Sequence, residues 1–461
     1  MKTKPLILLF LLTRIFLLNG QSILMFFPKF AGKSYDFIIF QGDQQKTVFQ
    51  GKIPEDGKFT LNVPKEYEPY TGMSRWLITG TKEGGGLDMV IPGKSFSVSC
   101  TEIQPTEKNI IYSGNDQVNE LNRLYADQQK ILMRYAAMQQ ALKSFPATDP
   151  GYPVFEKAGK EQQAAFRQFH QQISKNPDYA QKLIPIINIT QGMGTELTDT
   201  EEKRARNIAA YIAGNMDWQA LYTSGHWTSV ISAWVDIHSQ VLKDPYAFTT
   251  DFATIGNAMK DDKLYTDFAG RISYYLTQQG KDQLINMIAP LVVSSGRIKK
   301  YEGSLAAYTH GAIGTTAPDL IITRHLGSVQ DHNHDTTVLK SSELAVSPYT
   351  KTLLFFYESG CGPCENLLAQ LPGNYADLQK QGIRIISVSA DHDEKTFTEK
   401  AKTFPWKDAH CDYEGLKGIN FKNYGVAGTP TLFLIDRSGK ILLRTAGLDE
   451  VLDYLKKEKV H

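Results

Sequence analysis

Residues 352–370 constrain the fold of this chain more than any other part of the sequence. They read TLLFFYESGCGPCENLLAQ: an apolar run, a short polar turn, Cys361-Gly362-Pro363-Cys364, and a segment with helical spacing. A buried strand that leads into a helix with two cysteines in its first turn is the layout of a dithiol redox site. The stretch therefore predicts a strand, a tight turn and a helix that begins at the cysteines.

The two cysteines have different predicted roles. At the helix N-cap, unpaired backbone N–H groups and the helix dipole stabilise an anion, so Cys361 is the expected thiolate nucleophile. Cys364 lies one helical turn away, close enough to close a redox-active disulfide with Cys361. The alternative is half of a zinc site, but zinc usually has a second cysteine pair, and Cys100 and Cys411 are isolated in the sequence. We expect no metal and no organic cofactor.

The composition is that of a folded protein long enough for about three domains. Of its 461 residues, 42% are hydrophobic and 21% are charged. The formal net charge is +1, so no strong field attracts nucleic acid or an anionic membrane. The sequence therefore indicates a multidomain globular protein that does not bind nucleic acid.

Residues 1–22 have the pattern of a signal peptide. Lys2 and Lys4 form a basic start, and residues 5–18 are mostly apolar. Arg14 interrupts the apolar run, which disfavours the alternative of an uncleaved membrane anchor. Export places the protein in the periplasm or cell envelope, an oxidising compartment.

Residues 23–113 are predicted to form a small β-rich N-terminal domain. Its segments are rich in β-branched and aromatic residues and are separated by Gly-Asp and Asp-Gly turns. The predicted strands are 35–40, 47–50, 59–63, 76–79, 89–91 and 96–100. Three glycines at 84–86 lack the lysine of a phosphate-binding loop, so a hairpin tip is expected there.

Residues 114–302 are predicted to form a helical domain. Between 118 and 142, apolar residues recur mostly at three- and four-residue steps, the pattern of one long helix. Further helices are expected at 154–174, 201–214, 227–241, 250–259 and 264–279. The aromatic residues Trp218, Tyr222, Trp227 and Trp234 favour core packing over a ligand groove. This region contains no motif with recognisable chemistry.

Residues 303–461 alternate between strands and helices. Strands are expected at 353–356, 383–389, 431–435 and 440–445, with a helix at 361–380 that is interrupted or bent at Pro372. The order β-α-β-α-β-β-α predicts a parallel pair followed by an antiparallel final pair, as in thioredoxin. The stretch 331–335, DHNHD, is expected to be a polar hairpin loop rather than a metal site.

The C-terminal region resembles the thioredoxin-like domain of the TlpA/ResA-type exported thiol–disulfide oxidoreductases. The resemblance rests on the CGPC motif, on Gly428-Thr429-Pro430-Thr431 before LFLID, and on the Ala-Pro-Asp lead-in at 317–319. It implies that Pro430 is cis and lies beside the cysteines. Thr429 and Pro430 are then the expected substrate-binding residues, because Thr429 presents its backbone to an extended substrate.

The sequence departs from this family at three positions near the cysteines. Phe355 stands where thioredoxins have a buried Asp, Gly362 where some exported relatives have Glu, and Gly360 where Trp is common. Glu358 is the nearest carboxylate before the site, and it is expected to face solvent. The sequence therefore identifies no proton acceptor for Cys364.

These features together predict a thiol–disulfide oxidoreductase that acts on protein or small-molecule disulfides. Gly-Pro between the cysteines matches the strongly reducing thioredoxin type, at about −270 mV, which suggests a reductase served by a membrane-bound electron donor. Two alternatives remain open. One is a peroxiredoxin-like peroxidase, for which Ser359 lies close to Cys361. The other is an envelope binding protein in which the redox domain is incidental. The oligomeric state is not indicated.

Overall fold

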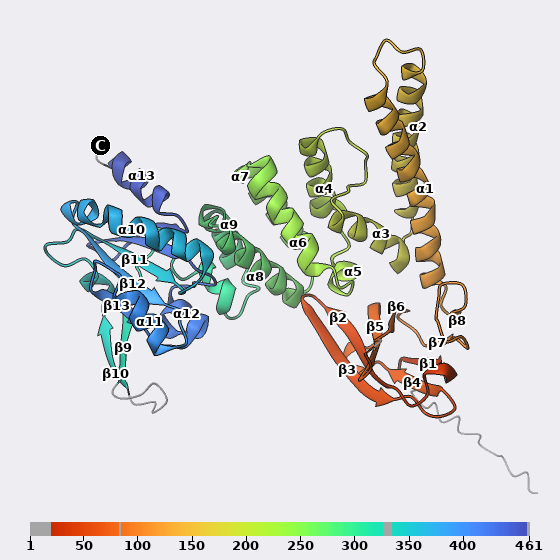
Figure 1. The fold of residues 1–461 in the computed structure, drawn as a ribbon, viewed down its shortest axis with the longest axis horizontal. Coiled ribbons are helices and arrows are strands. Elements are labelled where there is room, and N and C mark those ends of the chain that lie inside the picture. The colour runs from red at the N-terminus through yellow and green to blue at the C-terminus, as the bar shows by residue number, and fades with distance from the viewer. Residues whose placement is uncertain (1–19, 83, 326–333, 459–461) are drawn as a thin grey trace, which may run out of the picture. The chain divides into compact units, whose positions relative to one another are not determined.

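The computed structural model describes residues 20–82, 84–325 and 334–458 (Figure 1). All but the last three residues of the predicted signal peptide, 1–22, lie outside the described residues. The chain divides into two compact units. The first unit comprises residues 1–133, 171–184 and 223–225, and the second comprises 134–170, 185–222 and 226–461.

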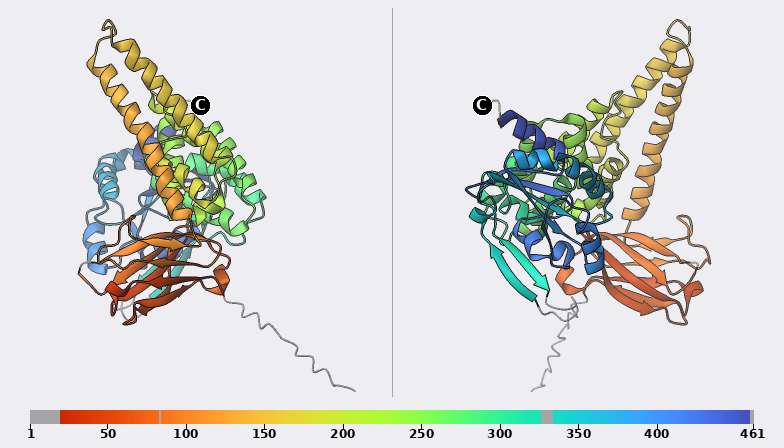
Figure 2. Two further views of the ribbon diagram at one scale, coloured as in Figure 1. Left: turned by 90° about the vertical axis from the view of Figure 1, so that its right-hand side faces the viewer. Right: turned by 60° about the vertical axis from the view of Figure 1, so that its left-hand side comes forward.

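The first unit is rich in strands that form two four-stranded sheets, in the orders β4-β1-β7-β8 and β3-β2-β5-β6 (Figure 2). The strands are β1 (Ser22–Phe26), β2 (Ser34–Gln41), β3 (Gln44–Lys52), β4 (Lys58–Asn62), β5 (Thr71–Thr79), β6 (Gly86–Pro92), β7 (Phe96–Ser99) and β8 (Ile111–Ser113). The core is aromatic: Trp76 is almost fully buried and its ring lies 4.7 Å from that of Phe27. The strand-rich prediction for this region is confirmed, and β1 is a strand that the sequence reading missed.

The middle of the chain is helical, as predicted. Its α-helices are α1 (Gln117–Ser144), α2 (Tyr152–Ile173), α3 (Tyr179–Thr190), α4 (Glu201–Asn215), α5 (Trp218–Tyr222), α6 (Trp227–Asp236), α7 (Pro245–Ala258), α8 (Asp262–Gln278) and α9 (Asp282–Ser294), with a π-helix at Ile237–Leu242. Trp218 is buried, with its ring 6.0 Å from that of Trp227 and 5.1 Å from that of Phe268. These aromatic residues therefore pack in a core, as the sequence favoured.

The C-terminal region of the second unit is a five-stranded sheet in the order β13-β12-β11-β14-β15. Its strands are β11 (Lys351–Tyr357), β12 (Ile383–Ser389), β13 (Asp408–Cys411), β14 (Thr431–Asp436) and β15 (Ile441–Thr445). β11 pairs with β12 in parallel and with β14 antiparallel, and β14 and β15 form the antiparallel final pair. The predicted topology is confirmed, with the short edge strand β13 added.

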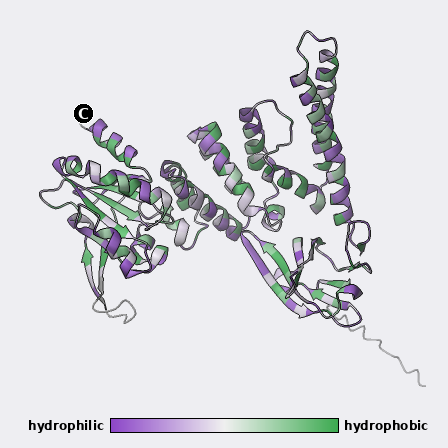
Figure 3. Ribbon diagram, in the orientation of Figure 1, coloured by the Kyte–Doolittle hydropathy of each residue, from purple (hydrophilic) through white to green (hydrophobic). Residues whose placement is uncertain are grey.

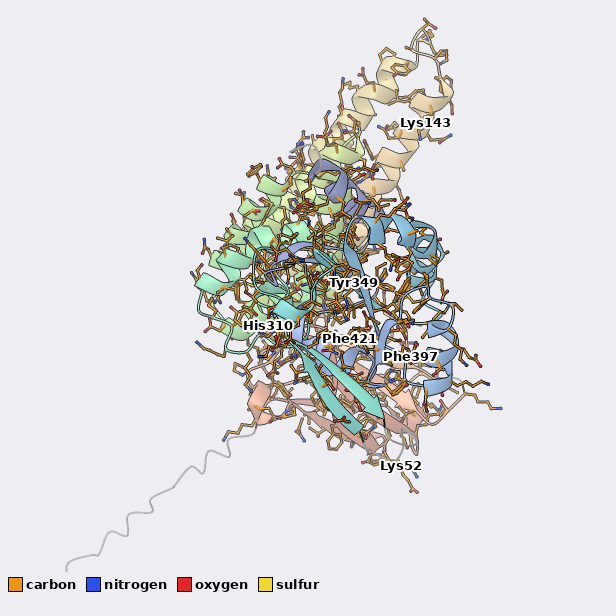
Figure 4. The ribbon with its side chains drawn as sticks, turned by 90° about the vertical axis from the view of Figure 1, so that its left-hand side faces the viewer. Lys52, Lys143, His310, Tyr349, Phe397 and Phe421 are labelled. Carbon is orange, nitrogen blue, oxygen red and sulfur yellow. The ribbon has the colours of Figure 1, made fainter. Side chains whose placement is uncertain are left out.

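Helices cover both faces of this sheet. α10 (Gly362–Lys380) and α13 (Leu448–Glu458) pack on one face, and α12 (Ile419–Asn423) packs on the other. Phe421 of α12, labelled in Figure 4, lies with its ring 5.0 Å from that of Phe356 in β11. In Figure 3 the central strands are mostly in the green of hydrophobic residues, consistent with burial on both faces. α10 runs through Pro372 without the interruption that the sequence suggested.

A hairpin of β9 (Leu320–His325) and β10 (His334–Leu339) precedes this sheet. Residues 331–333 of the predicted polar loop lie outside the described residues, and Asp335 is exposed in β10. Between α9 and β9, the 3-10 helix η4 (Gly303–Tyr308) contains the buried residues Ala306, Ala307 and Tyr308. Within the described residues, no helix has the length and apolar character needed to cross a membrane.

Buried polar contacts join α8 and α9 to the sheet within the second unit. Arg444 Nε in β15 lies 2.6 Å from Asp282 Oδ1 in α9, and both side chains are at most 3% exposed. Arg444 Nη2 also donates to the carbonyl of Gly425 at 2.9 Å. From η4, the hydroxyl of Tyr308 donates to the carbonyl of Ala269 in α8 at 2.8 Å. The Arg444–Asp282 pair therefore ties β15 of the sheet to α9, and the Tyr308 bond ties η4 to α8.

Candidate redox site

The cysteine motif lies at the predicted place, where β11 gives way to α10. β11 ends at Tyr357, and Cys361 is the N-cap residue of α10, with Pro363 in the first turn. Proline is tolerated there because the first N–H groups of a helix have no partner within the helix. Gly360 has φ +80°, a conformation that favours glycine, so the absence of Trp at this position has a backbone reason.

The two sulfur atoms lie 2.9 Å apart and differ in exposure. Cys364 is fully buried, whereas Cys361 is partly exposed. Burial, followed by the neighbouring Cys361 thiol, raises the pKa of Cys364 to about 12. Cys364 is therefore a protonated, protected thiol at neutral pH, and Cys361 is the sulfur that an external disulfide can reach.

The loop before β14 lies against Cys361. The Sγ of Cys361 is 3.7 Å from the carbonyl oxygen of Thr429 and 3.9 Å from its hydroxyl oxygen. The peptide bond between Thr429 and Pro430 is cis, as the resemblance implied. Pairing of β14 with β11 begins at Thr431, so Thr429 lies outside the ladder of the sheet. The structure thus brings together the four site residues named from the sequence.

A carboxylate that the sequence analysis missed secures the turn before Cys361. Glu365, in the first turn of α10, accepts the Gly360 N–H through Oε1 at 2.9 Å and the Lys400 ammonium through Oε2 at 2.6 Å. The bond to Lys400, and then the bond to Gly360, hold the pKa of Glu365 below its ordinary value. An acidic residue one position after Cys364, in the first turn of a helix, was the available signal.

A second missed carboxylate, Asp391, lies just beyond β12. It is 5% exposed and accepts the N–H of Ser359 at 2.9 Å and its hydroxyl at 2.7 Å. Tyr357 pairs with Ser389 at the ends of the parallel strands β11 and β12. This pairing brings together Ser359 and Asp391, which each follow their strand by two residues. Two polar residues after neighbouring parallel strands could have indicated this contact.

The residues at which the sequence departs from the family show why Cys364 lacks an acid partner. Phe355 is fully buried and its ring stacks on that of Tyr357 at 5.1 Å. Glu358 is exposed, as expected. In the described part of the chain, the groups that shift the pKa of Cys364 are Cys361, Thr429 and the Glu358 backbone, without a carboxylate side chain.

The other two cysteines are buried. Cys100 is 2% exposed and Cys411 is 6% exposed, and all four cysteines are free thiols. Burial raises the pKa of Cys411 to about 12. Among the described residues, no group of three or more His, Cys, Asp or Glu side chains is placed to hold a metal ion.

Comparisons with known proteins agree with this geometry. A family model described as thioredoxin-like matches residues 349–441. The thiol-disulfide oxidoreductase ResA of Bacillus cereus is 27% identical over 182 residues, which is 38% of this chain and 97% of that protein. Nucleoredoxin of Danio rerio is 31% identical over 121 residues, which is 26% of this chain and 27% of that protein.

Solved structures also match part of this chain. A thiol-disulfide oxidoreductase from Bacteroides fragilis is 23% identical, with a TM-score of 0.26, and the match covers 31% of this chain and 98% of that one. The C-terminal region of this chain is a TlpA/ResA-like thioredoxin domain, which places the protein among the thiol–disulfide oxidoreductases.

Proposed function

We propose that this protein reduces protein disulfides in the periplasm or cell envelope through the Cys361/Cys364 dithiol. The observation that carries the proposal is the pair of sulfur atoms 2.9 Å apart at the start of α10, one accessible and one buried. This asymmetry supports attack by Cys361 and resolution by Cys364.

The first step is attack of the Cys361 thiolate on one sulfur of the substrate disulfide. A bond forms between Cys361 Sγ and that sulfur, the substrate S–S bond breaks, and the second substrate sulfur leaves as a thiolate. The Thr429 carbonyl oxygen lies 3.7 Å from Cys361 Sγ, which supports binding of the substrate main chain by the Thr429 backbone beside the cystine. Pro430, next to Thr429, completes this substrate-binding edge.

The second step resolves the mixed disulfide. The Cys364 thiol gives its proton to the thiolate released in the first step and attacks Cys361 Sγ, which expels the first substrate sulfur. Two electrons and one proton have then passed from the protein to the substrate, and the first substrate sulfur, expelled in this step as a thiolate, takes its proton from water. Because the pKa of Cys364 is about 12, this deprotonation is the demanding part of the cycle.

A reduced dithiol is restored by a two-electron donor, which we propose to be membrane-bound. The Gly362-Pro363 pair between the cysteines matches the reducing thioredoxin type, at about −270 mV. Residues 1–22 are proposed to be the signal peptide that directs export. The proposed domains that follow are 23–113, 114–302 and 303–461.

The peroxidase alternative is disfavoured by the environment of Ser359. Its hydroxyl donates to Asp391 at 2.7 Å, so it is engaged in holding the turn rather than free for a peroxide at Cys361. Hydrogen peroxide consumption by the reduced protein tests this directly, and the proposal expects none above the background of free thiols.

The test of the proposed function is a redox titration of the full chain against glutathione, read by alkylation mass shift, together with reduction of insulin disulfides. We expect a potential near that of thioredoxin. Cys361→Ser should be inactive, and Cys364→Ser should accumulate a mixed disulfide. Cys411→Ser, a buried cysteine of the same sheet, is the matched control and should stay active.

A potential near about −120 mV would reverse the direction of transfer. If Cys361 and Cys364 never cycle, the protein is a binding protein.

A further inference from the structure

The last turn of α8 lies against the loop that precedes Pro430. Gln278 Nε2 donates to the carbonyl of Ala427 at 3.4 Å. The next residue, Gly428, is buried, and a Cβ atom at that position would clash with the Gln278 amide. The Gln278 side chain thus occupies the space that a side chain at position 428 would take.

In this loop, the carbonyl groups of every second residue from 425 to 429 face different partners. The carbonyl of Gly425 accepts from Arg444 Nη2 at 2.9 Å, and that of Ala427 accepts from Gln278. The carbonyl of Thr429 lies 3.7 Å from Cys361 Sγ. The Ala427 carbonyl is therefore held by a residue of α8, and the Gly425 carbonyl by an arginine that pairs with Asp282 of α9. The Thr429 carbonyl faces the Cys361 thiol.

The end of α8 is itself firmly held. The residue after Gln278, Gln279, donates through Nε2 to Asp236 Oδ1 at 2.7 Å and accepts the Ser239 hydroxyl at 2.7 Å. Gly280 follows with φ +63°, which ends the helix. Gln278 is exposed, so a fixed backbone presents its amide to anything that approaches this loop.

We propose that Gln278 is a substrate-positioning residue of the exchange site and that it favours a polypeptide segment as the disulfide substrate. The inference rests on the proposed function. A peptide that binds the Thr429 backbone and continues along the loop meets the Gln278 amide. Only one of its two N–H groups is used by Ala427, so the amide offers the peptide both a donor and an acceptor.

The substrate class follows from this geometry. Peptide groups next to a cystine carry the complementary donors and acceptors, whereas a small organic disulfide such as bis(2-hydroxyethyl) disulfide has no peptide group to bind the Gln278 amide. The contact should therefore lower KM for a peptide and leave reaction with a small disulfide unchanged.

The experiment compares Gln278→Met in the full chain with the wild-type protein. Methionine retains the packing on Gly428 and removes the amide. The two substrates are a short peptide closed by one internal disulfide and bis(2-hydroxyethyl) disulfide. We expect kcat/KM for the peptide to fall about fivefold, mainly through KM, with no change for the small disulfide.

Gln381→Met is the matched control. That glutamine, at the end of α10, also donates its side-chain amide to a backbone carbonyl, that of Asp377 at 3.1 Å, away from the loop. We expect it to behave as wild type with both substrates.

Three results would overturn the inference. Gln278→Met could reduce the peptide as fast as wild type does. It could slow both substrates equally or shift the Cys361/Cys364 potential, which would show that Gln278 only supports the loop. Wild-type protein that is inactive on both substrates would refute the proposed function itself, and this inference with it.

Discussion

Replacement of Arg444 by methionine tests whether α8 and α9 form one structural body with the thioredoxin-like sheet. The Arg444 guanidinium is 2% exposed, pairs with Asp282 at 2.6 Å, and donates to Gly425 at 2.9 Å. It also lies over the Phe433 ring at 5.2 Å. The substitution keeps most of the apolar stem and leaves the Asp282 carboxyl buried without its partner.

The expected loss of stability is large for one side chain. Removing one member of a buried ion pair costs about 3–5 kcal/mol, because the remaining charge stays desolvated. At a slope of about 3 kcal/mol per molar urea, this lowers the unfolding midpoint by about 1 M or more. The double variant Asp282→Leu, Arg444→Met removes both charges and should recover most of that loss.

The pH dependence supplies a second signature. Burial raises the pKa of Asp282 and Arg444 opposes this, so the pKa should rise further in Arg444→Met. A folded-state pKa above the unfolded value means that the folded state binds the proton more tightly. The stability that Asp282 contributes by binding this proton is then fully present below its unfolded pKa and is lost as the pH rises through its folded pKa. The deficit of Arg444→Met should therefore shrink from pH 8 to pH 5.

Urea denaturation should be followed with two readouts. Three of the five tryptophans, Trp218, Trp227 and Trp234, lie in the helices, so tryptophan fluorescence is weighted toward them, and alkylation of the buried Cys411 reports on the sheet. The two transitions should coincide in wild type and separate in Arg444→Met. Arg437→Met is the control, since this exposed arginine of the β14–β15 turn also donates to a carbonyl, at 3.1 Å.

Two results would contradict this prediction: a free energy of unfolding of Arg444→Met within about 1 kcal/mol of wild type, or a double variant as unstable as the single one. Either result would mean that the ion pair is solvated in solution and does not join the helices to the sheet. Arg437→Met should cost less than about 0.5 kcal/mol, as is usual for an exposed side chain.

Two further predictions concern the environment of the dithiol. Brief iodoacetamide treatment of the reduced protein at pH 7.5 should label Cys361 alone, because Cys364 is buried with a pKa of about 12; peptide mass spectrometry showing equal labelling of both would contradict this. The Glu365 carboxyl, whose pKa is lowered first by Lys400, contributes stability above its unfolded pKa that is lost as the pH falls through the folded pKa. In an NMR titration, Lys400→Met should raise the Glu365 pKa and the exposed neighbour Lys402→Met should not; an unchanged pKa in both would mean that the ion pair is absent.

The parts of the fold that follow a local rule could be predicted from the sequence. The apolar runs predicted β11 and β12, and the cysteines marked the start of α10 within one residue. β13 was missed because its four residues, Asp408–Cys411, are too few and too polar to show a strand pattern. β1 was missed because its apolar residues follow directly on the predicted signal peptide.

The contacts that complete the site follow no local rule. Asp391 meets Ser359 across 32 residues of sequence, and Gln278 meets Ala427 across 149. Period and composition report which face of a strand or helix is buried, but not which distant element covers it. The site could therefore be predicted as far as its cysteines and its proline loop. The polar groups around it required the tertiary structure.

The link between the helical region and the sheet bears on how the dithiol should be studied. A domain on a flexible tether is joined by exposed, polar residues. Here the second half of η4 is buried, with Ala306 and Ala307 each 1% exposed and the Tyr308 hydroxyl bonded to α8. A chain shortened to residues 303–461 would lose Gln278 and would leave the side chain of Arg444 without its acid partner. The loop that faces Cys361 would then lack the Gln278 amide at Ala427, and the arginine that donates to Gly425 would lose the carboxylate that positions it. Exchange by such a fragment with a peptide disulfide should be slower than exchange by the full chain, even where its reaction with a small disulfide is equal.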